Sequence, residues 1–448
     1  DRDILLICLA PELDRRYERL FAYLQDDVSQ RRPTVNLVMN LLGDDVPDRF
    51  SVWERLVAGA PLRVHHLVSC LPDPNQREPV FLAHQLKVDQ RIVAHLLGDT
   101  APDARLSGAV RLEMNGASGG EARVSQKALA PIRAALATAT DAPLVYLQGP
   151  EGAGQREMAA ALCAEVRLSL VSVNLARLRA LSLPFELAWR LVAREGRLAE
   201  AALLVHGWEH CLDEAELPPP DLWEALLAYA RPVFLCGKRP WEPRDAARAR
   251  RLLRVELGVP PYAERLRCWE RKLEAQGEQC APERLAELAS KFRLTPGQIA
   301  NAVHTAADLA ASRGETISAA DLYAGARAHS SARLGKLAQK IRPRFDWGDL
   351  ILPADRLAQL YEICARARFG HVVHDEWGFG RKVAPSKGIS ALFAGESGTG
   401  KTMAAEVIAN ALGLELYRID LSAVVSKYIG ETEKNLSAIF AEAAASNA

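Results

Sequence analysis

Apolar residues recur at three- and four-residue steps through residues 1–115, which predicts a mostly helical N-terminal domain. In the segment PELDRRYERLFAYLQDD, the positions that share one helix face are Leu13, Tyr17, Leu20, Phe21 and Leu24. Thr34 precedes the apolar run VNLVMNLL and is the expected N-cap of another helix. FLAHQLKVDQRIVAHLLGD is interpreted as two short helices with a turn at residues 87–89. Short helices joined by small turns are typical of winged-helix and helix-turn-helix domains.

After a glycine-rich segment at residues 113–123, interpreted as a linker, the pattern changes to apolar runs separated by helical stretches. The expected strands are LVYLQ (144–148), LSLVSVNL (168–175), EAALLVHGW (200–208) and RPVFLCG (231–237). Buried strands that alternate with helices predict a parallel, doubly wound sheet. Helical segments follow to about residue 330, among them LTPGQIANAVHTAADLAA with its Pro–Gly start.

A second unit of the same kind begins near residues 346–360. It has an expected strand ISALFA (389–394), a glycine-rich loop, a helix (401–412) and an expected strand LELYRID (414–420). The loop starting at Gly395 repeats the spacing of one that starts at Gly149, which indicates an internal repeat. We therefore expect an α/β chain of tandem modules, each a parallel doubly wound sheet plus a helical lid, with boundaries at 1–115, 124–335 and 341–448.

The second loop, GESGTGKT, matches the phosphate-loop pattern G-x-x-x-x-G-K-[ST] in full and lies between an expected strand and an expected helix. Its glycines let the backbone wrap closely around phosphates, and the helix N-terminus adds donors and positive potential. The candidate nucleotide-binding residues are Gly395, Glu396, Ser397, Gly398, Thr399, Gly400, Lys401, Thr402 and Met403. Lys401 is the candidate catalytic cation for the β- and γ-phosphates, and the Thr402 hydroxyl is the candidate Mg²⁺ ligand. ATP and Mg²⁺ are the cofactors that this motif predicts.

The first loop, GPEGAGQR, places Gln155 where Lys401 stands and Arg156 where Thr402 stands. Gln155 has no charge to offer phosphates, and a guanidinium cannot be a Mg²⁺ ligand. The third strand ends in His206 with only Glu209 nearby, and the fourth ends in Gly237 without a polar side chain. These defects indicate a phosphate-loop fold kept for structure, without hydrolysis. Two alternatives stay open: residual nucleotide binding through Arg156, and an unrelated α/β fold for residues 144–237.

Composition narrows the function classes. Lys plus Arg and Asp plus Glu number 56 each, which argues against a chain that coats nucleic acid or anionic membrane. Residues 1–115 hold 14 basic and 17 acidic side chains, so contact with protein is favoured over contact with DNA. The eight cysteines form no CxxC pair, so we expect neither a zinc site nor disulfides, and buried thiols instead. No apolar run is long enough to span a membrane and no signal peptide opens the chain, so the expected location is the cytoplasm.

At these residues the chain resembles AAA+ ATPases in a tandem arrangement. The segment KYIGETEKNL (427–436) is similar to the first pore loop of AAA unfoldases and remodelling ATPases, in which an aromatic–aliphatic pair grips polypeptide in the channel of a hexamer. The positions that match it are Lys427, Tyr428, Ile429 and Gly430. VPPYAERLRCWERKL resembles the start of an AAA lid, and LTPGQIANAV resembles the lid helix of the second sensor, with Gln298 where an arginine is usual.

Over essentially its whole length the chain resembles the winged-helix AAA ATPase of extracellular contractile injection systems, most specifically from residue 341 onward. That resemblance implies an ATP-driven remodeller serving such a particle in assembly, effector loading or disassembly, with a polypeptide or a particle component as partner. A working AAA module also needs an acidic strand end, a sensor and an arginine finger. The sequence stops at AEAAASNA before them, so we expect the intact protein to continue and these 448 residues alone to hydrolyse nothing. Two other functions stay open: a nucleotide-switched scaffold that docks a partner through its N-terminal domains, and a DNA-binding regulator.

Overall fold

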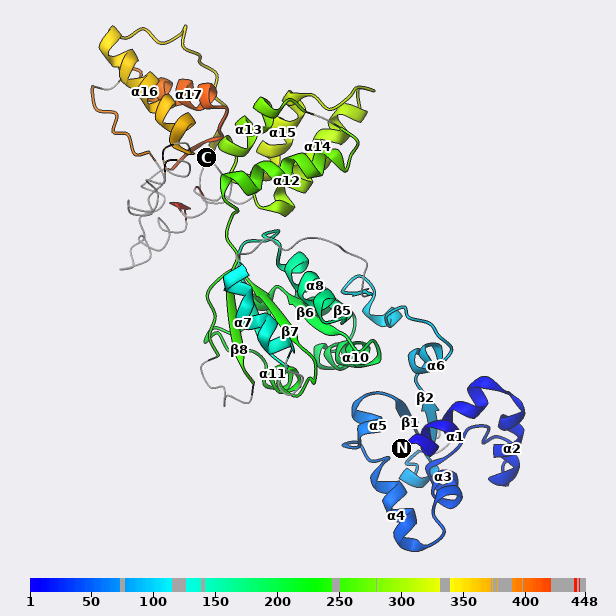
Figure 1. Cartoon of the computed structure of the whole chain (residues 1–448). Helices are drawn as coiled ribbons and strands as arrows, with labels where there is room; N and C mark the ends of the chain where they lie inside the picture. The colour runs from blue at the N-terminus through cyan, green and yellow to red at the C-terminus, as the bar shows by residue number, and fades with distance from the viewer. Residues whose placement is uncertain are drawn as a thin grey trace. The chain divides into compact units, whose positions relative to one another are not determined.

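The computed structural model describes residues 1–72, 77–114, 126–137, 142–243, 250–278, 280–330, 339–371, 373, 377, 389–396, 398–419, 439–440 and 443. The chain divides into two compact units. The first contains residues Asp1–Gly149 and Gln155–Glu256, and the second contains Pro150–Gly154 and Leu257–Ala448. Figure 1 gives the element labels used below.

The N-terminal part of the first unit is a helical domain with one antiparallel hairpin. Its elements are α1 (Arg2–Leu13), α2 (Arg16–Leu24), α3 (Val35–Leu42), α4 (Val46–Glu54), α5 (Pro61–Val64), β1 (Val68–Leu71), η1 (Phe81–Ala83), β2 (Gln85–Val88) and α6 (Gln90–Leu96). Thr34 caps α3 as expected, because its hydroxyl accepts from the Leu37 amide at 3.3 Å. Two short helices with a turn at residues 87–89 were expected in FLAHQLKVDQRIVAHLLGD. The second of them is α6, but residues 85–88 pair with β1 as a strand, so the expectation was wrong there.

The single helix expected across Leu13–Leu24 is interrupted at Asp14. The Asp14 carboxylate accepts from the backbone amide of Arg16 at 2.9 Å, which ends α1 and starts α2. Of the five apolar residues expected to share one helix face, Leu13 ends α1 and the other four lie on α2. Only Phe21 is buried, and the remaining four are between 42% and 55% exposed: Leu13, Tyr17, Leu20 and Leu24. The helical spacing is confirmed for α2, and most of its apolar face is open to solvent.

A six-stranded sheet forms the rest of the first unit, in the order β3-β5-β6-β7-β4-β8. All pairings are parallel except that of the edge strand β3 with β5. The strands are β3 (Val110–Glu113), β4 (Leu144–Gln148), β5 (Leu170–Asn174), β6 (Ala202–His206), β7 (Val233–Gly237) and β8 (Leu252–Glu256). The four expected strands are confirmed, whereas β3 and β8 were not anticipated.

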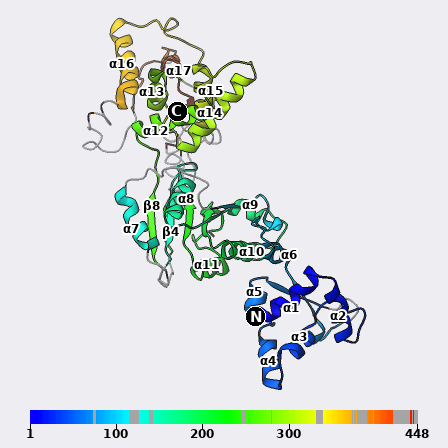
Figure 2. The ribbon, with the colours of Figure 1, turned by 45° about the vertical axis from the view of Figure 1, so that its right-hand side comes forward.

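Helices cover this sheet, and α7 lies against β8 (Figure 2). They are η2 (Ala104–Leu106), α7 (Gln126–Ala137), α8 (Gln155–Glu165), α9 (Leu175–Arg179), α10 (Phe185–Leu198), η3 (Trp208–His210) and α11 (Pro220–Leu227). Apolar side chains of the strands and of α10 and α11 form the core. Trp241 packs edge to face against both Trp208 and Trp223, whose rings are tilted relative to each other. The continuous apolar runs of the central strands match their burial on both faces.

A buried ionic cluster joins the N-terminal domain to α10. The Arg194 guanidinium, with only 2% of its side chain exposed, contacts Asp103 at 2.6 Å and Asp89 at 3.3 Å, and donates to the His66 carbonyl at 2.8 Å. Beside it, Arg91 Nε donates to Glu195 Oε2 at 2.9 Å. Burial raises the pKa of the Glu195 carboxyl despite this bond. The cluster therefore joins the N-terminal domain to α10 through ion pairs in which each part contributes one basic and at least one acidic side chain.

The second unit contains a bundle of four helices, α12 (Tyr262–Glu274), α13 (Pro282–Lys291), α14 (Pro296–Ala311) and α15 (Ala319–Ser330) (Figure 1). Its core is continuous across all four helices and includes Trp269, Phe292 and Leu294. Helix α14 begins in a capping box: Thr295 Oγ1 accepts from the Gln298 amide, and Gln298 Oε1 accepts from the Thr295 amide. The helix expected from the Pro–Gly start is confirmed.

The remaining elements are β9 (Gln339–Ile341), α16 (Ala354–His371), α17 (Lys401–Leu412) and β10 (Leu416–Arg418). A small apolar core between α16 and α17 includes Leu360 and Val407. The strand expected at 389–394 is absent from the described residues there, and this expectation was wrong. No described strand flanks this segment as β7 and β8 flank β4, and Leu392 is 94% exposed. The strand expected at 414–420 is shortened to β10, which pairs with β9.

Three expectations concern the cysteines, metal sites and membrane spans. All eight cysteines are free thiols, and six of them are buried. Burial raises the pKa of seven of these thiols: Cys8, Cys70, Cys163, Cys211, Cys236, Cys280 and Cys364. Within the described ranges, no cluster of three or more histidine, cysteine, aspartate or glutamate side chains could hold a metal ion. None of the described helices combines the length and apolar character that crossing a membrane requires.

Candidate functional site

The second glycine loop leads into α17, whose first residue is Lys401. Gly398 and Gly400 both have φ of +84°, a left-handed conformation that L side chains rarely adopt. Gly400 is the N-cap of α17, so the loop turns sharply into the start of a twelve-residue helix. The conformation of this loop therefore requires glycine at both positions, and it brings the backbone amides of the loop close to the N-terminus of α17.

The ammonium of Lys401 folds back over this loop. Its Nζ donates to the carbonyl of Gly395 at 3.0 Å and also to that of Glu396. Thr399 Oγ1 donates to the same Glu396 carbonyl at 2.8 Å. Thr402 is exposed in the first turn of α17, and Met403 is half-buried against the α16–α17 core. The structure thus brings together the candidate residues, apart from Ser397, which lies outside the described residues.

This donor set fits a triphosphate with a hard cation. An ammonium, left-handed glycines and a helix N-terminus favour phosphate oxygens. An exposed hydroxyl can serve as one Mg²⁺ ligand while waters and phosphate oxygens supply the others. The absence of an acidic metal cluster in the described ranges is compatible with such a site, because Mg²⁺ commonly keeps several waters.

The first glycine loop copies this geometry without its chemistry. Gly152 and Gly154 have φ of +77° and +101°, and Gln155 is the first residue of α8, as Lys401 is of α17. The Gln155 amide donates to the Gly149 carbonyl at 3.2 Å, with only 8% of the residue exposed. A neutral amide therefore occupies the lysine position as a structural brace.

Arg156 is also engaged within the protein. Its Nε donates to Glu113 Oε1 of β3 at 2.7 Å, and this hydrogen bond raises the pKa of the guanidinium. The side chain is 42% exposed, so the pair is partly solvated. This pairing weighs against the alternative of nucleotide binding through Arg156, since a phosphate would compete with a carboxylate already in contact.

The strand ends of the first module hold further internal contacts. His206 Nε2 lies 3.1 Å from Ser172 Oγ, and Lys238 Nζ lies 4.0 Å from Glu209. Lys238 was missed from the sequence, although it directly follows the glycine in which the fourth strand ends. The lysine thus stands at the limit of ion-pair distance from the single carboxylate expected near the end of β6.

Gly237 itself makes room for an aromatic ring. A Cβ at this position would lie 2.0 Å from the hydroxyl oxygen of Tyr146. That hydroxyl donates to the Arg239 carbonyl at 2.6 Å, and burial raises the pKa of Tyr146. The end of β7, where a γ-phosphate sensor would stand, is thus packed with the protein's own side chain.

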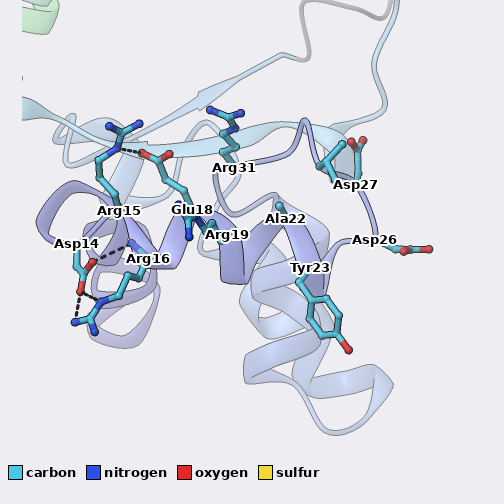
Figure 3. Close-up of a pocket in the computed structure, with 11 residues that line it drawn as sticks. Asp14, Arg15, Arg16, Glu18, Arg19, Ala22, Tyr23, Asp26, Asp27 and Arg31 are labelled. Carbon is cyan, nitrogen blue, oxygen red and sulfur yellow. Dashed lines mark hydrogen bonds and ion pairs between the residues drawn. The ribbon is translucent and has the colours of Figure 1, made fainter.

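An open depression of about 740 Å³ lies beside α2 in the N-terminal domain (Figure 3). Its lining mixes charges of both signs with exposed apolar residues: Tyr23 is 82% and Val28 is 87% exposed. Arg16 contacts Asp14 at 2.6 Å, and Arg15 contacts Glu18 at 3.5 Å. This surface was not anticipated as exposed, because helical spacing of apolar residues usually signals burial.

The expected pore-loop residues Lys427, Tyr428, Ile429 and Gly430 lie outside the residues that the structure describes. Their assignment therefore remains a prediction.

Three segments of the chain match family models. Residues 1–110 match "Winged helix domain, variant", residues 261–332 match "Contractile injection system ATPase helical domain", and residues 391–448 match "ATPase family associated with various cellular activities (AAA)". The helical-domain match coincides with the four-helix bundle, and the AAA match covers the second glycine loop.

Two curated proteins are similar over short stretches. One is "Uncharacterized AAA family ATPase y4kL" of Sinorhizobium fredii, 32% identical over 102 residues, which are 23% of this chain and 29% of that protein. Another is "ATPase family gene 2 protein" of Saccharomyces cerevisiae, 48% identical over 61 residues, which are 14% of this chain and 8% of that protein. The matched stretches thus span less than a third of either relative.

Proposed function

We propose, from the premise that this chain joins a winged helix domain, a contractile injection system ATPase helical domain and an AAA segment, that it is an ATP-dependent remodelling ATPase serving a contractile injection system. The second module, from residue 341 onward, hydrolyses ATP. The first module, residues 124–335, is structural. The work done on the particle is assembly, effector loading or disassembly.

The single observation that carries this proposal is the contrast between the two loops. In the second loop the Lys401 ammonium donates to backbone carbonyls of the loop, and the Thr402 hydroxyl is exposed at the N-terminus of a helix. The first loop presents a buried glutamine and an arginine paired with a carboxylate. Only one of the two loops has residues that can hold a Mg²⁺–nucleotide.

The roles of the chain's own residues follow from their chemistry. Bound Mg²⁺ would polarise the phosphates and neutralise part of their charge. Lys401 orients the β- and γ-phosphates and stabilises charge on the transferred group. Thr402 holds the cation through its hydroxyl, and the amides around Gly398 and Gly400 bind phosphate oxygens. The proposed polypeptide grip is Tyr428 with Ile429, in a homo-hexamer, as the resemblance of that segment implies. Free thiols in all eight cysteines support a reducing compartment, the cytoplasm.

The experiment is ATP turnover by the full-length protein. Lys401→Ala should lower turnover at least about a hundredfold, because a preorganised charge at the transferred phosphoryl group is lost. Gln155→Ala is the matched control, since it alters the equivalent residue of the first loop and should leave turnover within about twofold. Normal turnover by Lys401→Ala, or a comparable loss in Gln155→Ala with the fold intact, would contradict the proposal.

A second candidate is a nucleotide-switched scaffold that docks a partner through the N-terminal domain. It is favoured by the exposed apolar positions of α2 and by the depression beside them. In a monomeric soluble protein such a surface usually marks a site of protein contact. The two candidates differ in which surface contacts the partner: the segment around Tyr428 in the first, and the exposed face of α2 in the second.

A further inference from the structure

The glycine loop of the first module touches the lid helix α14 directly, backbone against backbone. The Gly297 amide donates to the Gly152 carbonyl at 2.9 Å, and Thr295 Oγ1 donates to the Glu151 carbonyl at 3.3 Å. These residues belong to one compact unit, in which Pro150–Gly154 groups with the lid. We call this set of contacts the loop–lid latch.

Both glycines of the latch are needed for the approach. A Cβ on Gly297 would lie 2.8 Å from the Gly152 Cα, closer than real Cβ contacts allow. A Cβ on Gly152 would lie 3.1 Å from the Gly297 Cα and 3.1 Å from Thr295 Oγ1. Gly297 has no left-handed φ, so the contact itself, rather than the local conformation, explains glycine inside the first turn of a helix.

The lid side of the latch is held firmly. Thr295 is 2% exposed and closes the capping box with Gln298. The Gln298 amide nitrogen also donates to the His329 carbonyl of α15 at 3.1 Å. Gln298 stands where the resemblance expects an arginine sensor, and here its side chain holds α14 against α15. The N-terminus of α14 that contacts the loop is therefore fixed within the lid.

The second loop has no such contact in the part of the chain that the structure describes. Gly398 corresponds to Gly152 by its place in the loop and has a similar φ. Nothing described lies within 4 Å of a Cβ built on Gly398 or Gly400. The latch observed between Gly152 and Gly297 thus lies in the module whose loop lacks the lysine and the hydroxyl.

We propose that the latch joins loop and lid of the first module permanently and without nucleotide. In nucleotide-dependent modules, lids close on a bound ligand, which contributes the energy of closure. Here a peptide hydrogen bond and a glycine–glycine contact take that place. The glycine loop of the first module then stays joined to α14 throughout a cycle driven by the second module. This inference is independent of ATP hydrolysis at Lys401, so either can fail alone.

The Gly297 amide is a specific reporter of the latch. The first four N–H groups of a helix have no partner inside the helix, so this amide is protected from exchange by the Gly152 carbonyl rather than by α14. Hydrogen exchange is measured by mass spectrometry on peptides covering residues 295–300. The protein is the full chain carrying Lys401→Ala, so that nucleotide at the second loop does not contribute. We expect protection without nucleotide, and a change of less than twofold on adding ATPγS with Mg²⁺.

Substitutions in the latch should speed this exchange. Gly152→Ala introduces a Cβ into the contact and should raise the rate at least about fivefold, the scale of one lost hydrogen bond. Gly154→Ala is the matched control, because it has the same left-handed strain in the same loop but nothing within 4 Å of the new Cβ. Its effect should stay below twofold. Gly297→Ala is a second variant that adds no left-handed strain and should match Gly152→Ala.

Three results would overturn the proposal. They are an unprotected Gly297 amide in the nucleotide-free chain, protection that arises only with ATPγS, and unchanged exchange in both Gly152→Ala and Gly297→Ala. Near-ultraviolet circular dichroism checks the fold of each variant. Should both variants unfold, the comparison of the chain with and without ATPγS still decides.

Discussion

The side-chain amide of Gln155 donates to the carbonyl of Gly149 at 3.2 Å, six residues earlier in the chain. The ammonium of Lys401 makes the same connection to Gly395, also six residues earlier, at 3.0 Å. The two loops are therefore braced in the same way, by a neutral side chain in one and a charged one in the other. The brace needs only a donor, whereas phosphate binding needs the charge.

Restoring that lysine alone should not restore a nucleotide site. In a Lys401→Ala background, Gln155→Lys should add no saturable, Mg²⁺-dependent binding of a fluorescent ATP analogue. The threonine position is still Arg156, paired with Glu113, and the end of β7 is still filled by Tyr146. The test is to titrate the double variant and the Lys401→Ala variant separately with the fluorescent ATP analogue and to compare the two binding curves. A new binding site with a stoichiometry near one would show that the charge was the only defect.

The pore-loop prediction separates the two candidate functions. Tyr428→Ala should keep ATP turnover within about threefold but abolish processing of a polypeptide substrate, because the aromatic grip is lost while Lys401 is untouched. Tyr23→Ala, which removes an exposed ring on α2, should spare processing of a substrate that does not need docking. Turnover and substrate cleavage by an added protease are measured in parallel. The reverse pattern would favour the scaffold.

The buried cluster around Arg194 should be costly to break. Arg194→Met removes the buried partner of Asp103 and Asp89, which keep their partly exposed pairs with Arg105, and we expect a loss of about 1.5–3 kcal/mol in the free energy of unfolding, the scale of a hydrogen bond to a charged group. Urea denaturation followed by tryptophan fluorescence measures it. Arg190→Met is the control, because Arg190 forms an exposed pair with Glu186 on the same helix and should cost about 0.5 kcal/mol or less. Equal losses in both variants would show that the cluster contributes nothing special.

The lid should lose stability in acid through Asp321. Its carboxylate accepts from Arg313 Nη2 and from Ser318 Oγ, both at 2.6 Å, and these bonds lower its pKa to about 2. A carboxylate with a depressed pKa stabilises the fold fully above its ordinary pKa near 4 and loses that contribution as the pH falls towards 2.

Asp321→Asn should therefore cost about 1.5–3 kcal/mol at neutral pH, and the difference from the parent should shrink between pH 4 and pH 2. Thermal unfolding across that range makes the measurement. Asp308→Asn, at an exposed position of α14, should track the parent at every pH. A difference for Asp321→Asn that stays constant with pH would argue against the hydrogen-bonded carboxylate as its source.

The sequence predicts the central strands well because a strand buried on both faces must be apolar throughout, as β4, β6 and β7 are. It does not reveal β8, whose side chains at Arg254 and Glu256 are exposed, as is usual at a sheet edge. It does not reveal that most of the apolar face of α2 is exposed, because spacing identifies a helix face but not whether anything covers that face. The strand expected at 389–394 fails for a related reason: an apolar run becomes a strand only where neighbouring strands pair with it.

Motif chemistry was predictable where spacing alone defines it, as in the residues from Gly395 to Thr402. Contacts between distant segments were not. The Arg156–Glu113 pair joins the start of α8 to a segment interpreted as a linker. Lys238 lies near Glu209 only because β6 and β7 are neighbours in the sheet. The Gly152–Gly297 contact gives no local signal beyond a glycine in the first turn of a helix.

The fit of Tyr146 beside Gly237 has an evolutionary consequence. A polar side chain at position 237 would collide with the ring, so it becomes tolerable only after the tyrosine has shrunk, and shrinking the tyrosine first would leave a hole in the core. A polar side chain at position 237 would therefore need a compensating change at position 146, so we expect the two positions to change together in evolution.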